Sequence, residues 1–152
     1  MTSAIAAPAL ENMVVNITQE TKVRASLEVT FAALLEQLGP GFDTPDGKPM
    51  PFVIEAFPGG RWFRDLGDGS GHLWGHVQAI KRPTLLEFCG PLMMSFAVAS
   101  NVQYRLSEVE GGTLISFHHF VFGVIPDAHR EGLNKGWTHI LEAIRSRAEA
   151  KK

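Results

Sequence analysis

Residues 75–88 read GHVQAIKRPTLLEF, and they hold two short apolar runs separated by Lys81-Arg82-Pro83. Short apolar runs that are bounded by turn-forming residues are typical of β-strands. A connection of a few residues cannot carry the crossover that parallel strands need, so the two strands must be antiparallel. The stretch therefore predicts a tight strand pair inside a larger antiparallel sheet.

The same alternation of strands and turns extends over residues 50–123. The turns contain Pro58-Gly59-Gly60, the segment GDGSG (67–71) and Glu110-Gly111-Gly112, the last with the composition of a hairpin turn. The Met-rich segment PLMMSF (91–96) is a further connector. The expected strands are PFVIEAF (51–57), RWFRDL (61–66), HLWGHVQAI (72–80), TLLEFCG (84–90), NVQYRLSEV (101–109) and TLISFHHFVFG (113–123).

Two helices are expected outside this region. A strand over residues 13–26 precedes a helix that begins after Ser26, a residue type that caps helix N-termini, and ends at Gly39-Pro40-Gly41. A long helix is expected from about residue 127 to residue 150, with an apolar stripe formed by Leu133, Trp137, Ile140, Leu141 and Ile144. This order predicts an α+β fold in which the C-terminal helix packs against a curved antiparallel sheet of about seven strands.

Composition restricts the function classes. Residues 1–152 are expected to form one domain, with residues 1–12 loosely ordered, and 45% hydrophobic with 20% charged residues is typical of a globular chain. The net charge of -2 and the lack of a basic stripe argue against nucleic-acid binding. No run reaches the roughly 20 apolar residues of a membrane helix, and no secretory signal is recognised. The single cysteine, Cys89, favours a reducing compartment, so the cytoplasm is expected.

Four motifs in a fixed order resemble a known superfamily. They are Gly59-Gly60 followed by RWFR (61–64), the pattern G-x-V-x-x-I-x-x-P-x-x-L-x-F over residues 75–88, GGTLISFHH (111–119) and GWTHILEAI (136–144). Together they resemble the START-like, or SRPBCC, superfamily of helix-grip folds, in particular the branch named after activators of the heat-shock-protein ATPase. The resemblance spans roughly residues 14–148.

The resemblance implies a deep, mostly apolar cavity between the curved sheet and the long helix. Relatives bind lipids, sterols, polyketides or plant hormones, and some catalyse cyclisation or dehydration, so the fold alone selects no function. A polar anchor, Arg64, is expected near the cavity. The residues expected to line the cavity are Trp62, Phe88, Met94, His119 and Trp137.

His118 and His119 are adjacent in sequence, but neighbouring side chains of a strand point to opposite faces. The two histidines therefore cannot readily bind one metal ion or act as a contiguous pair. The family's matching strand has a histidine at the position of His119, so His119 is expected to face the helix and His118 the outside. Two readings of His119 stay open. It is a structural or pocket-lining polar group, or it is a catalytic base.

Other candidate chemistry is weaker. His72 and His76 have zinc-pair spacing on a helix, but on a strand they would lie roughly 13 Å apart, so no metal site is expected. An inward Arg64 would need Glu55 or Glu87 as a partner, or would hold an anionic ligand group. The chain has no nucleophile elbow, phosphate-binding glycine loop or dinucleotide motif, and no cofactor is expected.

Three functional hypotheses follow. The first is a non-catalytic protein that binds a small hydrophobic molecule, as a monomer or a homodimer. The second is an enzyme of cyclase, dehydratase or lyase type that uses His119 as general base, with Arg64 or Glu55 assisting. The third is an interaction module for a chaperone ATPase, as the name of the family branch suggests.

Overall fold

Seven antiparallel strands form one open sheet in the order β1-β7-β6-β5-β4-β3-β2. A computed structural model gives the structure of the chain, and it describes residues 9–93 and 95–151. The prediction of about seven antiparallel strands in an α+β fold is confirmed. The strands are β1 (Val14–Val23), β2 (Val53–Ile54), β3 (Arg61–Gly67), β4 (Ser70–Lys81), β5 (Leu85–Cys89), β6 (Val98–Val109) and β7 (Gly112–Gly123).

A long hairpin joins β6 and β7, two interior strands of the sheet, which pair from Val98↔Gly123 to Val109↔Gly112. Its turn contains Gly111 at a φ of 83°, in the left-handed region that glycine adopts without strain. β7 also pairs with β1 along the full length of β1, so its backbone is hydrogen-bonded on both sides. The odd-numbered residues of β7 are buried, because they face the helices.

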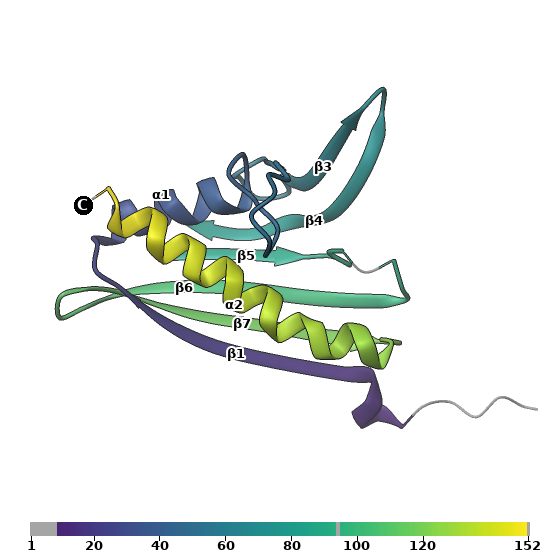
Figure 1. Cartoon of the computed structure of the whole chain (residues 1–152). Helices are drawn as coiled ribbons and strands as arrows, with labels where there is room; N and C mark the ends of the chain where they lie inside the picture. Colours follow the sequence, from purple (N-terminus) through teal and green to yellow (C-terminus); the bar gives the residue numbers. More distant parts are fainter. Residues whose placement is uncertain (1–8, 94, 152) are drawn as a thin grey trace, which may run out of the picture.

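The bounds of β2 and β6 differ most from the expected ones. β2 contains only Val53 and Ile54, because Pro51 precedes it and the turn at Pro58-Gly59 follows soon after. β6 begins three residues before the expected Asn101. β3 and β4 carry bulges between Trp62 and Phe63 and between Asp65 and Gly67. Figure 1 shows the β3–β4 hairpin bending away from the other strands, as bulged strands do.

Two helices, α1 (Leu27–Leu38) and α2 (Asp127–Glu149), lie on the same face of the sheet (Figure 1). The Ser26 hydroxyl accepts a hydrogen bond from the backbone N–H of Val29 at 3.2 Å, which confirms Ser26 as the N-cap of α1. α2 runs diagonally across the sheet and buries its apolar stripe, with α1 beside its C-terminal half. The buried stripe comprises Leu133, Trp137, Ile140, Leu141, Ile144 and Ala148.

Part of the N-terminal stretch expected to be loosely ordered forms a turn of 3-10 helix, η1 (Leu10–Met13). Arg130 of α2 holds this turn, because its guanidinium donates to the carbonyl of Asn12 at 2.5 Å and to that of Val14 at 2.8 Å. η1 is therefore attached to the first turn of the long helix.

Candidate functional site

A cavity of about 580 Å³ lies beside the N-terminal half of α2. Its other walls are the segment 42–50 between α1 and β2, Trp74 of β4, and the start of the connector between β5 and β6. Figure 1 shows the segment between α1 and β2 reaching toward α2. The apolar residues of the lining are Phe42, Pro45, Met50, Trp74, Leu92, Met93, Ala128, Leu133, Trp137 and Ile140. The polar residues of the lining are Asp43, Thr44, His129, Lys135 and His139.

Two glycines of α2, Gly132 and Gly136, line the same cavity one helical turn apart. A Cβ atom added at either position would meet no heavy atom within 4 Å. Glycine inside a helix costs up to about 1 kcal/mol relative to alanine. No close backbone approach requires these glycines, so their effect on the structure is to leave this wall of the cavity open.

Trp137 lines the cavity, as expected, and its indole N–H donates to Nδ1 of His119 at 2.9 Å. His119 lies on the buried face of β7 with 0% of its surface exposed, whereas His118 is half-buried on the other face and lies 2.5 Å from Oδ1 of Asn16. The prediction that the two histidines point in opposite directions is confirmed. His119 is not among the residues that line the cavity.

Burial, with a smaller contribution from the nearby charge of His118, lowers the pKa of His119 from 6.5 to about 4. His119 is therefore neutral near neutral pH. Because Nδ1 accepts the indole hydrogen bond, the ring proton is on Nε2, which is buried and has no hydrogen-bond partner among the described residues. The arrangement fixes the tautomer of His119 and the orientation of Trp137.

Trp62 and Phe88 belong to an aromatic cluster behind the cavity wall. The two rings stack with centroids 4.7 Å apart, and Trp62 meets Trp74 edge to face at 5.2 Å. The Trp62 indole N–H donates to the carbonyl of Leu38, at the end of α1, at 2.7 Å. Neither Trp62 nor Phe88 is exposed or lines the cavity. Trp62 contacts Trp74, which does line the cavity, and Phe88 packs on Trp62.

Glu55 and Glu87, the two carboxylates expected as partners of Arg64, bind other residues. Glu55 forms a bidentate ion pair with Arg61 at 2.8 Å, and this pairing lowers the pKa of Glu55 to about 2. Glu87 accepts a hydrogen bond from Gln103. Arg64 donates instead to the carbonyl of Pro51 at 2.9 Å. Met94 lies outside the described residues.

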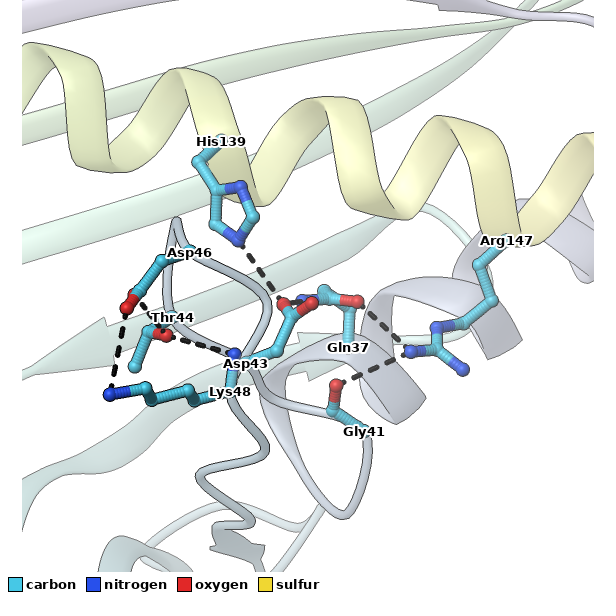
Figure 2. A network of polar contacts seen from close by, with 8 residues as sticks. All are labelled: Gln37, Gly41, Asp43, Thr44, Asp46, Lys48, His139 and Arg147. Atoms are coloured by element: carbon cyan, nitrogen blue, oxygen red, sulfur yellow. Dashed lines mark hydrogen bonds and ion pairs between the residues drawn. The ribbon is translucent and has the colours of Figure 1, made fainter.

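A chain of polar contacts reaches the cavity from α1 and from the C-terminal half of α2 (Figure 2). Nε2 of His139 lies 3.1 Å from Oδ1 of Asp43, which also accepts a hydrogen bond from the side-chain amide of Gln37 at 2.9 Å. The Gln37 carbonyl oxygen accepts from Arg147 at 3.1 Å, and Arg147 also donates to the carbonyl of Gly41 at 3.3 Å. Of this chain, Asp43 and His139 line the cavity.

The segment that carries Asp43 is itself ordered by hydrogen bonds. Asp43 and Pro49 form an isolated β-bridge, and the backbone N–H of Thr44 donates to the carbonyl of Lys48 at 2.9 Å. The Thr44 hydroxyl donates to Asp46 at 2.7 Å and accepts from the Lys48 N–H at 3.1 Å (Figure 2). Asp43 is thus held on a closed loop beside the helix.

Sequence reasoning missed Trp74, Asp43 and His139. His139 follows Gly132 and Gly136 by seven and three residues, which places it on the same helix face, so helical spacing could have identified it. Trp74 is a buried residue of β4 beside Gly75. The alternation of a strand does not show whether a buried side chain lines a cavity or fills the core. Asp43 lies in a loop with no periodicity, and no sequence pattern connects it to a helix almost a hundred residues later.

Within the described residues, no group of three or more His, Cys, Asp or Glu side chains is placed to hold a metal ion. No helix in this part of the chain has both the length and the apolar character that a membrane span requires.

Comparisons with known proteins identify the fold. No protein-family model matches the chain, and no curated protein matches it. Among solved structures, the di-domain ARO/CYC StfQ from the steffimycin biosynthetic pathway matches 93% of this chain with a TM-score of 0.67 at 12% identity. The chain spans 53% of the length of StfQ, about half of that di-domain protein.

Two further structures match over nearly their full length. The match to the AHSA1-like protein from Aeromonas hydrophila covers 90% of this chain and 94% of that protein's chain, with a TM-score of 0.63 at 18% identity. Ara h 8.0201 covers 90% of this chain and 99% of its own, with a TM-score of 0.63 at 15% identity. The seven-stranded antiparallel sheet, the long C-terminal helix and these likenesses together show that the chain has a helix-grip fold.

Proposed function

We propose that the chain binds a small, largely apolar molecule in the cavity beside α2. The observation that carries this proposal is a hollow of about 580 Å³ whose helical wall contains two glycines with open space beside them. Pockets for small molecules typically measure roughly 300–1,000 Å³ and combine apolar walls with a few polar groups. The cavity has both properties.

The lining indicates the kind of ligand. Trp74, Trp137 and Phe42 provide flat aromatic surfaces, which favour a planar or ring-containing molecule. Asp43 and His139 provide a polar site at one part of the wall, so a ligand with a single polar end fits better than a plain hydrocarbon. StfQ, the di-domain ARO/CYC protein from the steffimycin biosynthetic pathway, supports the proposal at the level of a shared fold.

A fluorescence titration with the amphiphilic dye 1-anilinonaphthalene-8-sulfonate, which has apolar rings and one anionic sulfonate group, tests the proposal. The wild-type protein should bind the dye saturably, with one site per chain. The Gly136→Leu variant should bind it at least about tenfold more weakly, because the new side chain occupies part of the cavity. Losing the burial of about two methylene groups of dye surface is enough for that factor.

A matched control is Ser146→Leu, which places the same side chain on an exposed position of α2 outside the cavity lining. The control should bind the dye as the wild type does. Equal binding by wild type and Gly136→Leu would show that the dye binds elsewhere and would refute the proposed site.

The expectation that His119 acts as a catalytic base finds no comparable support. Its Nδ1 accepts a hydrogen bond from Trp137. Among the described residues, His118 is the one ionisable group that affects the pKa of His119, and it lies on the opposite face of the strand. We infer that His119 has a structural role in orienting Trp137, which forms part of the proposed binding site.

A further inference from the structure

The Asp43–His139 pair lies in the wall of the cavity, and its side chains are partly accessible, with 34% of Asp43 and 25% of His139 exposed. A carboxylate can only accept hydrogen bonds, so the contact of 3.1 Å requires Nε2 of His139 to carry the proton. In the neutral ring the other nitrogen, Nδ1, is then the one with a free lone pair. Figure 2 shows Nδ1 without a contact to any of the residues drawn.

The pair is supported from behind. Gln37, which is 1% exposed, donates to the same Oδ1 atom of Asp43, and Arg147 fixes the orientation of the Gln37 amide by donating to its oxygen. Burying a polar side chain as large as glutamine is unfavourable unless its hydrogen bonds are made. Here both ends of the Gln37 amide are satisfied, and the result is a carboxylate held in one orientation against His139.

A histidine whose one nitrogen is hydrogen-bonded to an oriented carboxylate, and whose other nitrogen is free, is the usual arrangement of a general base. We propose that Asp43 and His139 form a general-base site that removes a proton from a ring-containing apolar molecule bound in the cavity. His139 is the catalytic residue of this proposal, and Asp43 and Gln37 are positioning residues. The proposal rests on the binding function proposed above.

The substrate class follows from the same geometry. The molecule carries its acidic C–H or O–H group at the polar part of the wall and rests its rings on the aromatic side chains. In the step itself, Nδ1 takes the proton, the electron pair of the broken bond stays on the substrate, and the imidazolium returns the proton to water or to the product. No oxidant, reductant or further reactant is needed.

Two other groups of the lining are also basic. His129 has a buried Nε2 without a partner among the described residues, but its ring meets Phe96 edge to face and no carboxylate contacts it. Lys135 is exposed on α2. Among the described residues, neither His129 nor Lys135 has an oriented carboxylate in contact with it, as His139 has. Substituting each of the three residues therefore shows which one removes the proton.

The test uses 5-nitrobenzisoxazole, a small flat molecule that reports directly on a base in an apolar site. Removal of its ring C–H proton makes the C–N bond a nitrile while the N–O bond breaks, and the coloured product 2-cyano-4-nitrophenolate is followed by absorbance. The wild type should accelerate this reaction with saturation. The His139→Gln variant should lose at least about 100-fold in kcat, since general bases contribute at least that factor.

The positioning role has its own readout. Asp43→Asn should lower kcat roughly 10- to 100-fold with little change in KM, because the side chain keeps its size in the cavity wall but loses the negative charge that stabilises the protonated ring of His139. His139→Ala should regain part of its activity when imidazole is added, which a merely structural role would not give. The control His72→Gln, at an exposed position outside the cavity lining, should keep the wild-type rate.

Dye binding separates the two proposals. Variants of His139 that bind 1-anilinonaphthalene-8-sulfonate normally but have lost the reaction support both proposals. A wild type that binds the dye but does not accelerate the reaction, or a His139→Gln variant that keeps the full rate, overturns the general-base proposal alone. Loss of the rate in His129→Gln or Lys135→Met in place of His139→Gln overturns it as well. A wild type that binds no dye overturns the binding proposal itself.

Discussion

The burial of His119 makes the free energy of unfolding depend on pH. In the folded chain its pKa is about 4, whereas in the unfolded chain it has the ordinary value of 6.5. Above pH 6.5 the ring is neutral in both states. As the pH falls toward 4, the unfolded chain takes up a proton that the folded chain does not, so the free energy of unfolding decreases.

The loss should reach roughly 3 kcal/mol by about pH 4. Urea unfolding of wild type and His119→Gln at several pH values checks this, because the variant has no titrating ring and its glutamine oxygen can still accept from Trp137. The variant should show a flatter pH dependence between pH 6.5 and 4, whereas the exposed control His72→Gln should follow the wild type. Parallel curves for His119→Gln and wild type would contradict the assignment. Glu55, whose pKa is lowered from 4.5 to about 2, also begins to lose its contribution to stability as the pH falls toward 4, but this loss is the same in wild type and both variants and does not affect the comparison.

Trp62 gives a second residue-scale prediction. Trp62→Phe keeps a large ring in the aromatic cluster but removes the donor to the Leu38 carbonyl, so the free energy of unfolding should fall by about 1–3 kcal/mol. Dye binding should be unchanged, because Trp62 lies behind the cavity wall. Lost binding with unchanged stability would instead make Trp62 a ligand contact, as its motif implied.

At the scale of the element, the decisive feature of α2 is its pair of cavity-facing glycines. Gly132→Ala and Gly136→Ala should each raise the free energy of unfolding by up to about 1 kcal/mol, because the helix gains propensity and the new methyl meets nothing within 4 Å. Both should weaken dye binding.

Gly60→Ala is the contrasting variant, since its Cβ would lie 1.8 Å from the carbonyl oxygen of Glu55, and it should destabilise the protein. Thermal unfolding of the three variants measures the difference. A loss of stability in the α2 variants would show that the space beside the glycines is filled.

At the scale of the whole molecule, the cavity joins segments that are far apart in the chain, and a bound ligand should hold them together. Hydrogen exchange should be slowest in β6 and β7, whose backbones are paired on both sides in the middle of the sheet. Saturation with dye at about 100 times its dissociation constant should slow exchange in segment 42–50 and in the first half of α2, by up to about 100-fold where opening releases the ligand. Peptide-level exchange with and without dye measures this. Equal exchange in both samples would place the dye elsewhere.

The sequence by itself determined the elements and their order. Val15, Ile17 and the alternating residues of β7 predicted strand faces because a strand repeats every two residues, and Ser26 and Gly39 bounded α1 through backbone hydrogen bonding. The opposite directions of His118 and His119 followed from the same local geometry. Four ordered motifs then predicted the helix-grip fold, which the structure has.

Only the tertiary structure decided which of these side chains meet. Trp62 and Phe88 were expected to line the cavity, but the sequence does not distinguish a residue of the cavity wall from one in the layer behind it. The positions of Trp74 and of segment 42–50 decide which residues form the wall. The contact between Asp43 and His139 joins a loop to a helix 96 residues away, and Gln37 and Arg147 are separated by 110. Local propensity carries no information about such pairs, because their positions are set by the packing of α1 and α2 on one face of a curved sheet.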